Sequence, residues 1–89
     1  MGEQARRPRV TVLVRARCPT CDRMERTVRA VCEETATAWE SVDVDAPGTD
    51  PELRGEYGDV VPVTLVDGRE HASWSVDPEA LRAALAASV

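Results

Sequence analysis

Two cysteines, Cys18 and Cys21, are the residues of this chain whose type and spacing could do chemistry. Pro19 and Thr20 separate them, so the two thiols stand three positions apart. Within the first turn of a helix, this spacing brings them close enough to close a disulfide. The pattern indicates reversible disulfide chemistry, in which electrons move between thiols.

The setting of Cys18 indicates why its thiol would be reactive. An apolar, largely β-branched run ends at Val14, and an amphipathic stretch begins after Cys18, so we expect the pair at the junction of a strand and a helix. The free N–H groups and the helix dipole stabilise an anion there, which lowers a thiol pKa from its ordinary value of about 8.5. Pro19 suits the first helical position, because its missing N–H would have no partner within the helix.

Arginines are concentrated around the cysteine pair. Eight arginines and three acidic residues precede Cys32, although the whole chain has a net charge of −5. Arg15 and Arg17 are the best placed to favour a thiolate at Cys18. The next arginines are expected on a solvated face, namely Arg23, Arg26 and Arg29. Since no aromatic residues interleave them and the overall balance is acidic, we expect no binding of nucleic acid.

The first half of the chain predicts a strand, a helix and a second strand. Residues 9–14 are typical of a central strand covered on both faces, and residues 39–44 of a second strand. Residues 19–34 between them predict a helix with an apolar stripe at Met24, Val28, Val31 and Cys32.

The second half predicts two helices around a hairpin. Asp50 caps a short helix that ends at Tyr57 before Gly58, with Leu53 and Tyr57 on its buried face. Residues 63–66 and 70–75 predict strands joined by a tight turn at 67–68. A last helix begins after Asp77 and directs three residues to the core, which are Leu81, Ala84 and Leu85.

This βαβαββα order predicts an α/β fold with a mixed four-stranded sheet flanked by helices. The first two strands pair in parallel through the helix, and the hairpin adds antiparallel strands. The layout is that of a minimal thioredoxin-type fold, with the cysteines at the carboxyl end of a central strand. The 89 residues predict a single domain, in which residues 1–8 form a disordered or loosely ordered tail.

Composition predicts a soluble, cytoplasmic protein. The sequence has neither a signal peptide pattern nor an apolar run of membrane-spanning length, so we expect no contact with a membrane. Its three cysteines are an odd number, which argues against a disulfide scaffold and for a catalytic or metal-binding pair in a reducing compartment.

The sequence resembles the glutaredoxins, and most closely the short glutaredoxin-like proteins. The resemblance rests on the strand at residues 10–14, Arg15 three residues before the motif, the Cys-Pro-Thr-Cys motif itself, and Val61-Pro62 ahead of a hairpin turn. It spans roughly residues 9–87. Cys-x-x-Cys alone is a weak signal, but its combination with the later Val-Pro is specific.

The resemblance implies a dithiol–disulfide oxidoreductase. Cys18 would be the attacking thiolate and Cys21 the resolving thiol, acting on a disulfide-containing protein or a mixed disulfide. A low-molecular-weight thiol or a partner reductase would restore the dithiol, with no bound cofactor. We expect the protein to be a monomer.

The resemblance also assigns supporting residues. Arg15 would stabilise the Cys18 thiolate or hold a carboxylate of the thiol co-substrate, and the backbone of Val61 would pair with that substrate. The Val61–Pro62 bond is expected to be cis, the alternative being a trans proline at the start of a strand.

Three departures from the usual glutaredoxin pattern bear on the substrate. Thr20 replaces the common aromatic residue, and Val61 replaces the common threonine before the proline. The Gly-Gly that admits glutathione is absent from residues 72–77, where Trp74 adds bulk. We therefore expect a reductant other than glutathione in its ordinary mode. Trp74 is a candidate to line the substrate groove, although Trp74 and Trp39 are otherwise expected to cover the core or sheet.

Two other functional classes remain open, and only the first uses the same cysteines. One is a metal or iron–sulfur binding module, but zinc would need two more ligands, and only Cys32 and His71 remain. Cys32 lies about 16 Å along the helix from Cys21 and on its apolar stripe, so we expect an inert core thiol and no metal site. His71 is expected to be an ordinary surface or half-buried residue. The other class is a non-catalytic binding protein on a thioredoxin-type scaffold.

Overall fold

A computed structural model describes residues 8–87 of the chain. Its elements follow the predicted order and are β1 (Val10–Val14), α2 (Pro19–Glu34), β2 (Trp39–Asp43), α3 (Pro51–Tyr57), β3 (Val63–Val66), β4 (Arg69–Ser73) and α4 (Pro78–Ala87). The expected tail at residues 1–8 lies, apart from Pro8, outside the described residues.

The four strands form one mixed sheet in the order β2-β1-β3-β4. β1 pairs in parallel with β2 and antiparallel with β3, and β3 and β4 form the antiparallel hairpin. The predicted sheet is confirmed. β1 is central, and Val10, Val12 and Leu13 on it are completely buried.

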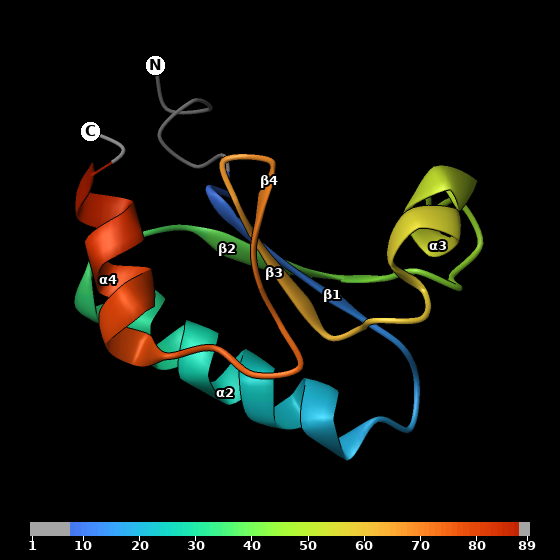
Figure 1. The fold of residues 1–89 in the computed structure, drawn as a ribbon, viewed down its shortest axis with the longest axis horizontal. Coiled ribbons are helices and arrows are strands. Elements are labelled where there is room, and N and C mark those ends of the chain that lie inside the picture. Colours follow the sequence, from blue (N-terminus) through green and yellow to red (C-terminus); the bar gives the residue numbers. More distant parts are fainter. Residues whose placement is uncertain (1–7, 88–89) are drawn as a thin grey trace.

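Helices cover both faces of the sheet (Figure 1). On one face, α2 and α4 pack their buried residues against Val10 and Val12 of β1. On the other face, α3 packs against Leu13 at the end of the same strand. The predicted stripe of α2 is fully buried, whereas Leu53 and Tyr57 of α3 are only half-buried, because this short helix covers one end of the sheet.

The helices begin where their capping residues predict. Asp50 accepts a hydrogen bond from the Glu52 amide at 2.9 Å, and Pro51 takes the first position of α3. The Asp77 carboxylate accepts from the Glu79 amide at 3.4 Å at the start of α4. Such caps bond N–H groups that have no partner within the helix.

The hairpin turn is as predicted, but strand β4 is shorter than expected. Asp67 and Gly68 both have positive φ, 51° and 83°, as a two-residue hairpin turn of this kind requires. β4 ends at Ser73 rather than at residue 75. The reason is Trp74, whose φ of 71° turns the chain out of the extended conformation.

Within residues 8–87, no helix combines the length and apolar character needed to cross a membrane.

Candidate functional site

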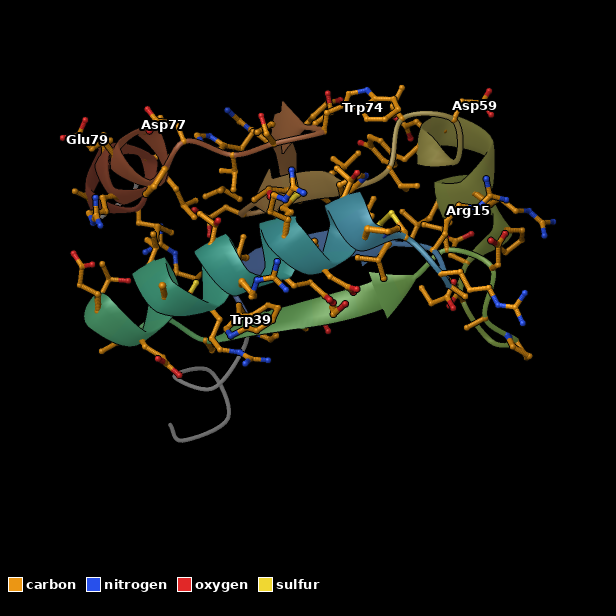
Figure 2. All side chains as sticks on the ribbon, turned by 90° about the horizontal axis from the view of Figure 1, so that it is seen from below. Arg15, Trp39, Asp59, Trp74, Asp77 and Glu79 are labelled. Carbon is orange, nitrogen blue, oxygen red and sulfur yellow. A yellow bond between two sulfur atoms is a disulfide. The ribbon has the colours of Figure 1, made fainter. Side chains whose placement is uncertain are left out.

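Cys18 and Cys21 form a disulfide at the start of α2, with their Cα atoms 5.1 Å apart. Figure 2 draws it as a yellow bond at the first turn of the helix. Cys18 is the N-cap residue, and its sulfur accepts a hydrogen bond from the Cys21 amide at 3.1 Å. The cysteine pair therefore lies at the expected junction of strand and helix, and the Cys18 sulfur faces the N-terminal end of α2.

The two cysteines differ in exposure. Cys18 is half-buried, whereas Cys21 is 1% exposed. When the bond is reduced, the amide and the helix dipole at Cys18 favour a sulfur anion there. The geometry therefore makes Cys18 the member of the pair that an outside molecule can reach.

Strand register gathers several loops around this pair. Leu13 near the end of β1 lies opposite Val63 at the start of β3, and Val63 lies opposite Ser73 at the end of β4. The loop that leads to Cys18, the segment before β3 and the segment after β4 consequently leave the sheet at the same edge. This arrangement brings together three parts of the chain that are far apart in sequence.

The segment before β3 carries Val61 and Pro62. Their peptide bond is cis. Pro62 is buried and Val61 half-buried, and the Pro62 carbonyl accepts a hydrogen bond from the Trp74 amide at 2.8 Å. This bond ties the segment before β3 to the segment after β4.

Arg15 makes contacts that the sequence did not predict. Its Nε lies 2.7 Å from Oδ2 of Asp45, its Nη2 lies 3.3 Å from Oδ1, and its Nη1 donates to the Gly58 carbonyl at 3.2 Å. Arg54 also approaches Asp45, at 4.0 Å. Figure 2 shows Arg15 on the α3 side of the disulfide. Through its contacts with Asp45, Arg15 thus links the loop before Cys18 to the loop after β2.

This pairing changes the charge around Arg15. The hydrogen bond with Arg15 holds the pKa of the Asp45 carboxyl below its ordinary value and raises the pKa of the guanidinium. In the disulfide-bonded state the positive charge of Arg15 is therefore balanced by Asp45. A contribution of Arg15 to the Cys18 thiolate stays a prediction for the reduced state. The position of Asp45 just after β2 could have indicated this contact. β2 runs parallel to β1, so the two strands end at the same edge of the sheet.

The other residues predicted to support the pair lie close to it along the chain. Arg17 is exposed and has a φ of 57°, an uncommon value for a residue other than glycine. Pro19 is exposed at the first position of α2, as expected, and Thr20 is half-buried.

Trp74 does not cover the core or the sheet, which corrects one of its two expected roles. It is 57% exposed and is the only large apolar residue that is exposed among the described residues. Trp74 lines a groove of about 160 Å³ between α2 and residues 74–76. Trp39, by contrast, is half-buried and packs against the main core as expected.

On the α2 side, this groove is lined by Thr20, Arg23, Met24 and Thr27. Of these, only Thr20 was predicted to belong to the site. Thr20, Arg23 and Thr27 follow one another at steps of three and four residues, so they form a polar row beside the apolar stripe. That spacing was the available signal, but the sequence does not show that Trp74 lines the same groove.

A model of the glutaredoxin-like domain family (DUF836) matches residues 9–86. The chain belongs to this family. Uncharacterized proteins of Mycobacterium bovis and Mycobacterium tuberculosis are 42% identical to it over 84 residues, which are 92% of this chain and 87% of theirs.

Solved structures agree with this assignment. A structural genomics target from Xanthomonas campestris is 34% identical, with a TM-score of 0.67 over 88% of this chain and 96% of its own. A mutant thioredoxin from Halobacterium salinarum is 25% identical, with a TM-score of 0.59 over 88% of this chain and 71% of its own. The glutaredoxin-like domain therefore has a thioredoxin-like fold, as the order of its elements predicts.

His71 and the acidic residues add no metal centre to the described part of this glutaredoxin-like domain. Within residues 8–87, no group of three or more His, Cys, Asp or Glu side chains is arranged to hold an ion. His71 is half-buried on β4, as expected.

Cys32 of the glutaredoxin-like domain is expected to be inert in the native state. It is 1% exposed within the main core, and burial raises the pKa of its thiol. Since the thiolate is the reactive form, a thiol reagent at pH 8 should find almost no reactive thiol in the native, oxidised protein. The same reagent should find one thiol after unfolding in denaturant. Rapid reaction of Cys32 without denaturant would contradict its placement.

Proposed function

We propose that this glutaredoxin-like domain is a dithiol–disulfide oxidoreductase, with Cys18 as nucleophile and Cys21 as resolving thiol. The asymmetry of the pair carries the proposal, because Cys18 caps α2 and is half-buried while Cys21 is 1% exposed. A substrate disulfide has to reach the attacking sulfur in line, and only the more exposed cysteine allows this approach.

The reaction needs two thiol–disulfide exchanges. The Cys18 thiolate attacks one sulfur of the substrate disulfide, forms a mixed disulfide and releases the other substrate sulfur as a thiolate. The Cys21 thiolate then attacks the Cys18 sulfur and releases the second substrate thiol. The substrate gains two electrons and two protons, and the protein is left with the Cys18–Cys21 disulfide.

Neighbouring residues support these steps. Pro19 starts the helix whose open end faces Cys18, and Arg17 brings a positive charge next to it. The Val61–Pro62 segment, at the same edge of the sheet, would offer its backbone to an extended substrate. Arg15 would act by positioning the loop before Cys18 through Asp45.

An outside thiol has to recycle the protein. A low-molecular-weight thiol or a protein reductase in the cytoplasm would supply two electrons to the Cys18–Cys21 disulfide, with no cofactor bound to the chain. Trp74 stands where typical glutaredoxins have a Gly-Gly, which favours a reductant other than glutathione in its ordinary mode.

A redox titration tests the proposal. The protein is equilibrated in buffers of defined thiol to disulfide ratio, and its free thiols are counted after acid quenching. We expect one reversible two-electron transition, together with thiol-dependent reduction of bis(2-hydroxyethyl) disulfide. Cys32→Ala is the matched control and should show the same transition. A pair that never re-forms its disulfide would refute the proposal, and stoichiometric zinc or visible absorbance in the purified protein would favour a metal-binding module.

A further inference from the structure

We propose that the groove between Trp74 and Arg23 binds a segment of a disulfide-bearing protein that carries an acidic residue and an apolar residue next to its cysteine. The inference rests on the proposed disulfide exchange and names the class of substrate for it. It adds a recognition surface beside the cysteine pair, formed by α2 and residues 74–76.

The groove begins beside the cysteine pair. Thr20, which lies between the two cysteines, forms its beginning, and Thr27 lines its far part. These residues are about 10 Å apart along the helix axis, at about 1.5 Å per residue. An extended chain covers this distance with about three residues. A substrate joined to Cys18 through its own cysteine would therefore lay its next residues along the groove, whereas a small thiol would fill only the first part.

Arg23 supplies a positive charge to the groove. Its guanidinium makes no hydrogen bond or ion pair with any residue in the described range 8–87, in contrast to those of Arg15 and Arg82, which each hold a carboxylate. The chain as a whole has a net charge of −5, so the attraction for a carboxylate comes from local arginines and not from the overall charge. A carboxylate that reaches the groove meets Arg23, and Arg17 before Cys18 likewise has no partner among these residues.

Trp74 supplies the apolar contact. It is 57% exposed, although aromatic side chains dominate buried contacts in most proteins. Its backbone has a φ of 71°, which is unfavourable for a bulky residue, and the hydrogen bond from its amide to the Pro62 carbonyl holds it there. The structure thus keeps a largely exposed tryptophan in the lining of the groove at a conformational cost. A tryptophan and a cation that line one groove suit a carboxylate with an apolar side chain next to it.

Matched peptides test this assignment. Short peptides with one cysteine, joined to 2-mercaptoethanol as a mixed disulfide, carry Glu, Gln or Lys beside the cysteine, and Leu or Gly at the next position. The fully reduced protein is mixed with each peptide, and the second-order rate constant is divided by that of dithiothreitol with the same peptide. This ratio removes the intrinsic reactivity of each disulfide.

We expect the wild-type protein to prefer the Glu peptide to the Lys peptide by about fivefold at low salt, and by less in about 0.5 M salt. Arg23→Glu should reverse the preference, whereas Arg26→Glu, the same charge change on a helix residue outside the groove, should keep it. Trp74→Ala should reduce the advantage of Leu over Gly by about threefold.

The outcomes separate the two proposals. If the wild-type protein reduces bis(2-hydroxyethyl) disulfide but treats all the peptides alike, the groove assignment is wrong and the proposed function stands. The assignment is also overturned if Arg26→Glu shifts the preference as much as Arg23→Glu. If the wild-type protein reduces none of these disulfides, the proposed function itself fails.

Discussion

A Cys18→Ser variant is expected to lose disulfide reduction by at least about a thousandfold, because a serine hydroxyl is not ionised at neutral pH and is a poor nucleophile toward sulfur. Cys18 is the half-buried N-cap of α2, and the variant retains every other residue around it. The measurement is the steady-state reduction of bis(2-hydroxyethyl) disulfide with a thiol reductant.

Two matched variants make this result specific. Cys32→Ala removes a thiol that is buried in the core and should keep the wild-type rate. Cys21→Ser leaves the attacking thiol in place but removes the resolving one, so it should accumulate a mixed disulfide that mass spectrometry detects after acid quenching. Wild-type turnover by Cys18→Ser, or a mixed disulfide on Cys21 instead, would reverse the assigned roles.

The second large effect is expected on stability, from Leu81→Ala. Leu81 of α4 is completely buried, in the core between the sheet and α2. Truncation of a buried leucine to alanine costs about 2–5 kcal/mol, a large part of the roughly 5–15 kcal/mol by which domains are stable. In a domain of this size, we expect Tm to fall by at least about 10 °C.

Leu53→Ala is the control for this prediction. It makes the same change on α3, where the side chain is only half-buried, so it should cost less than Leu81→Ala. Both variants are unfolded in urea with the Cys18–Cys21 disulfide intact, and their midpoints are compared at equal slope. An equal or greater loss for Leu53→Ala would mean that the core between α3 and the sheet is as important as the one under α4.

Local patterns were enough to predict most of the fold. The buried stripe of α2 follows from helical periodicity, and its start follows from Pro19. The turn at Asp67-Gly68 follows from two residues that tolerate positive φ. The end of β4 was wrong by two residues, because nothing in the local sequence marks Trp74 as a residue with positive φ.

The sequence by itself determined the candidate redox pair, since a Cys-Pro-Thr-Cys motif between a strand and a helix depends only on neighbouring residues. Tertiary structure alone decided what surrounds it. Arg15 binds Asp45, thirty residues away, and Trp74 lines the same groove as Arg23. These contacts depend on which strand ends meet at one edge of the sheet and on the turn of the chain after β4. Both are set by packing between distant segments, which no local pattern of residues encodes.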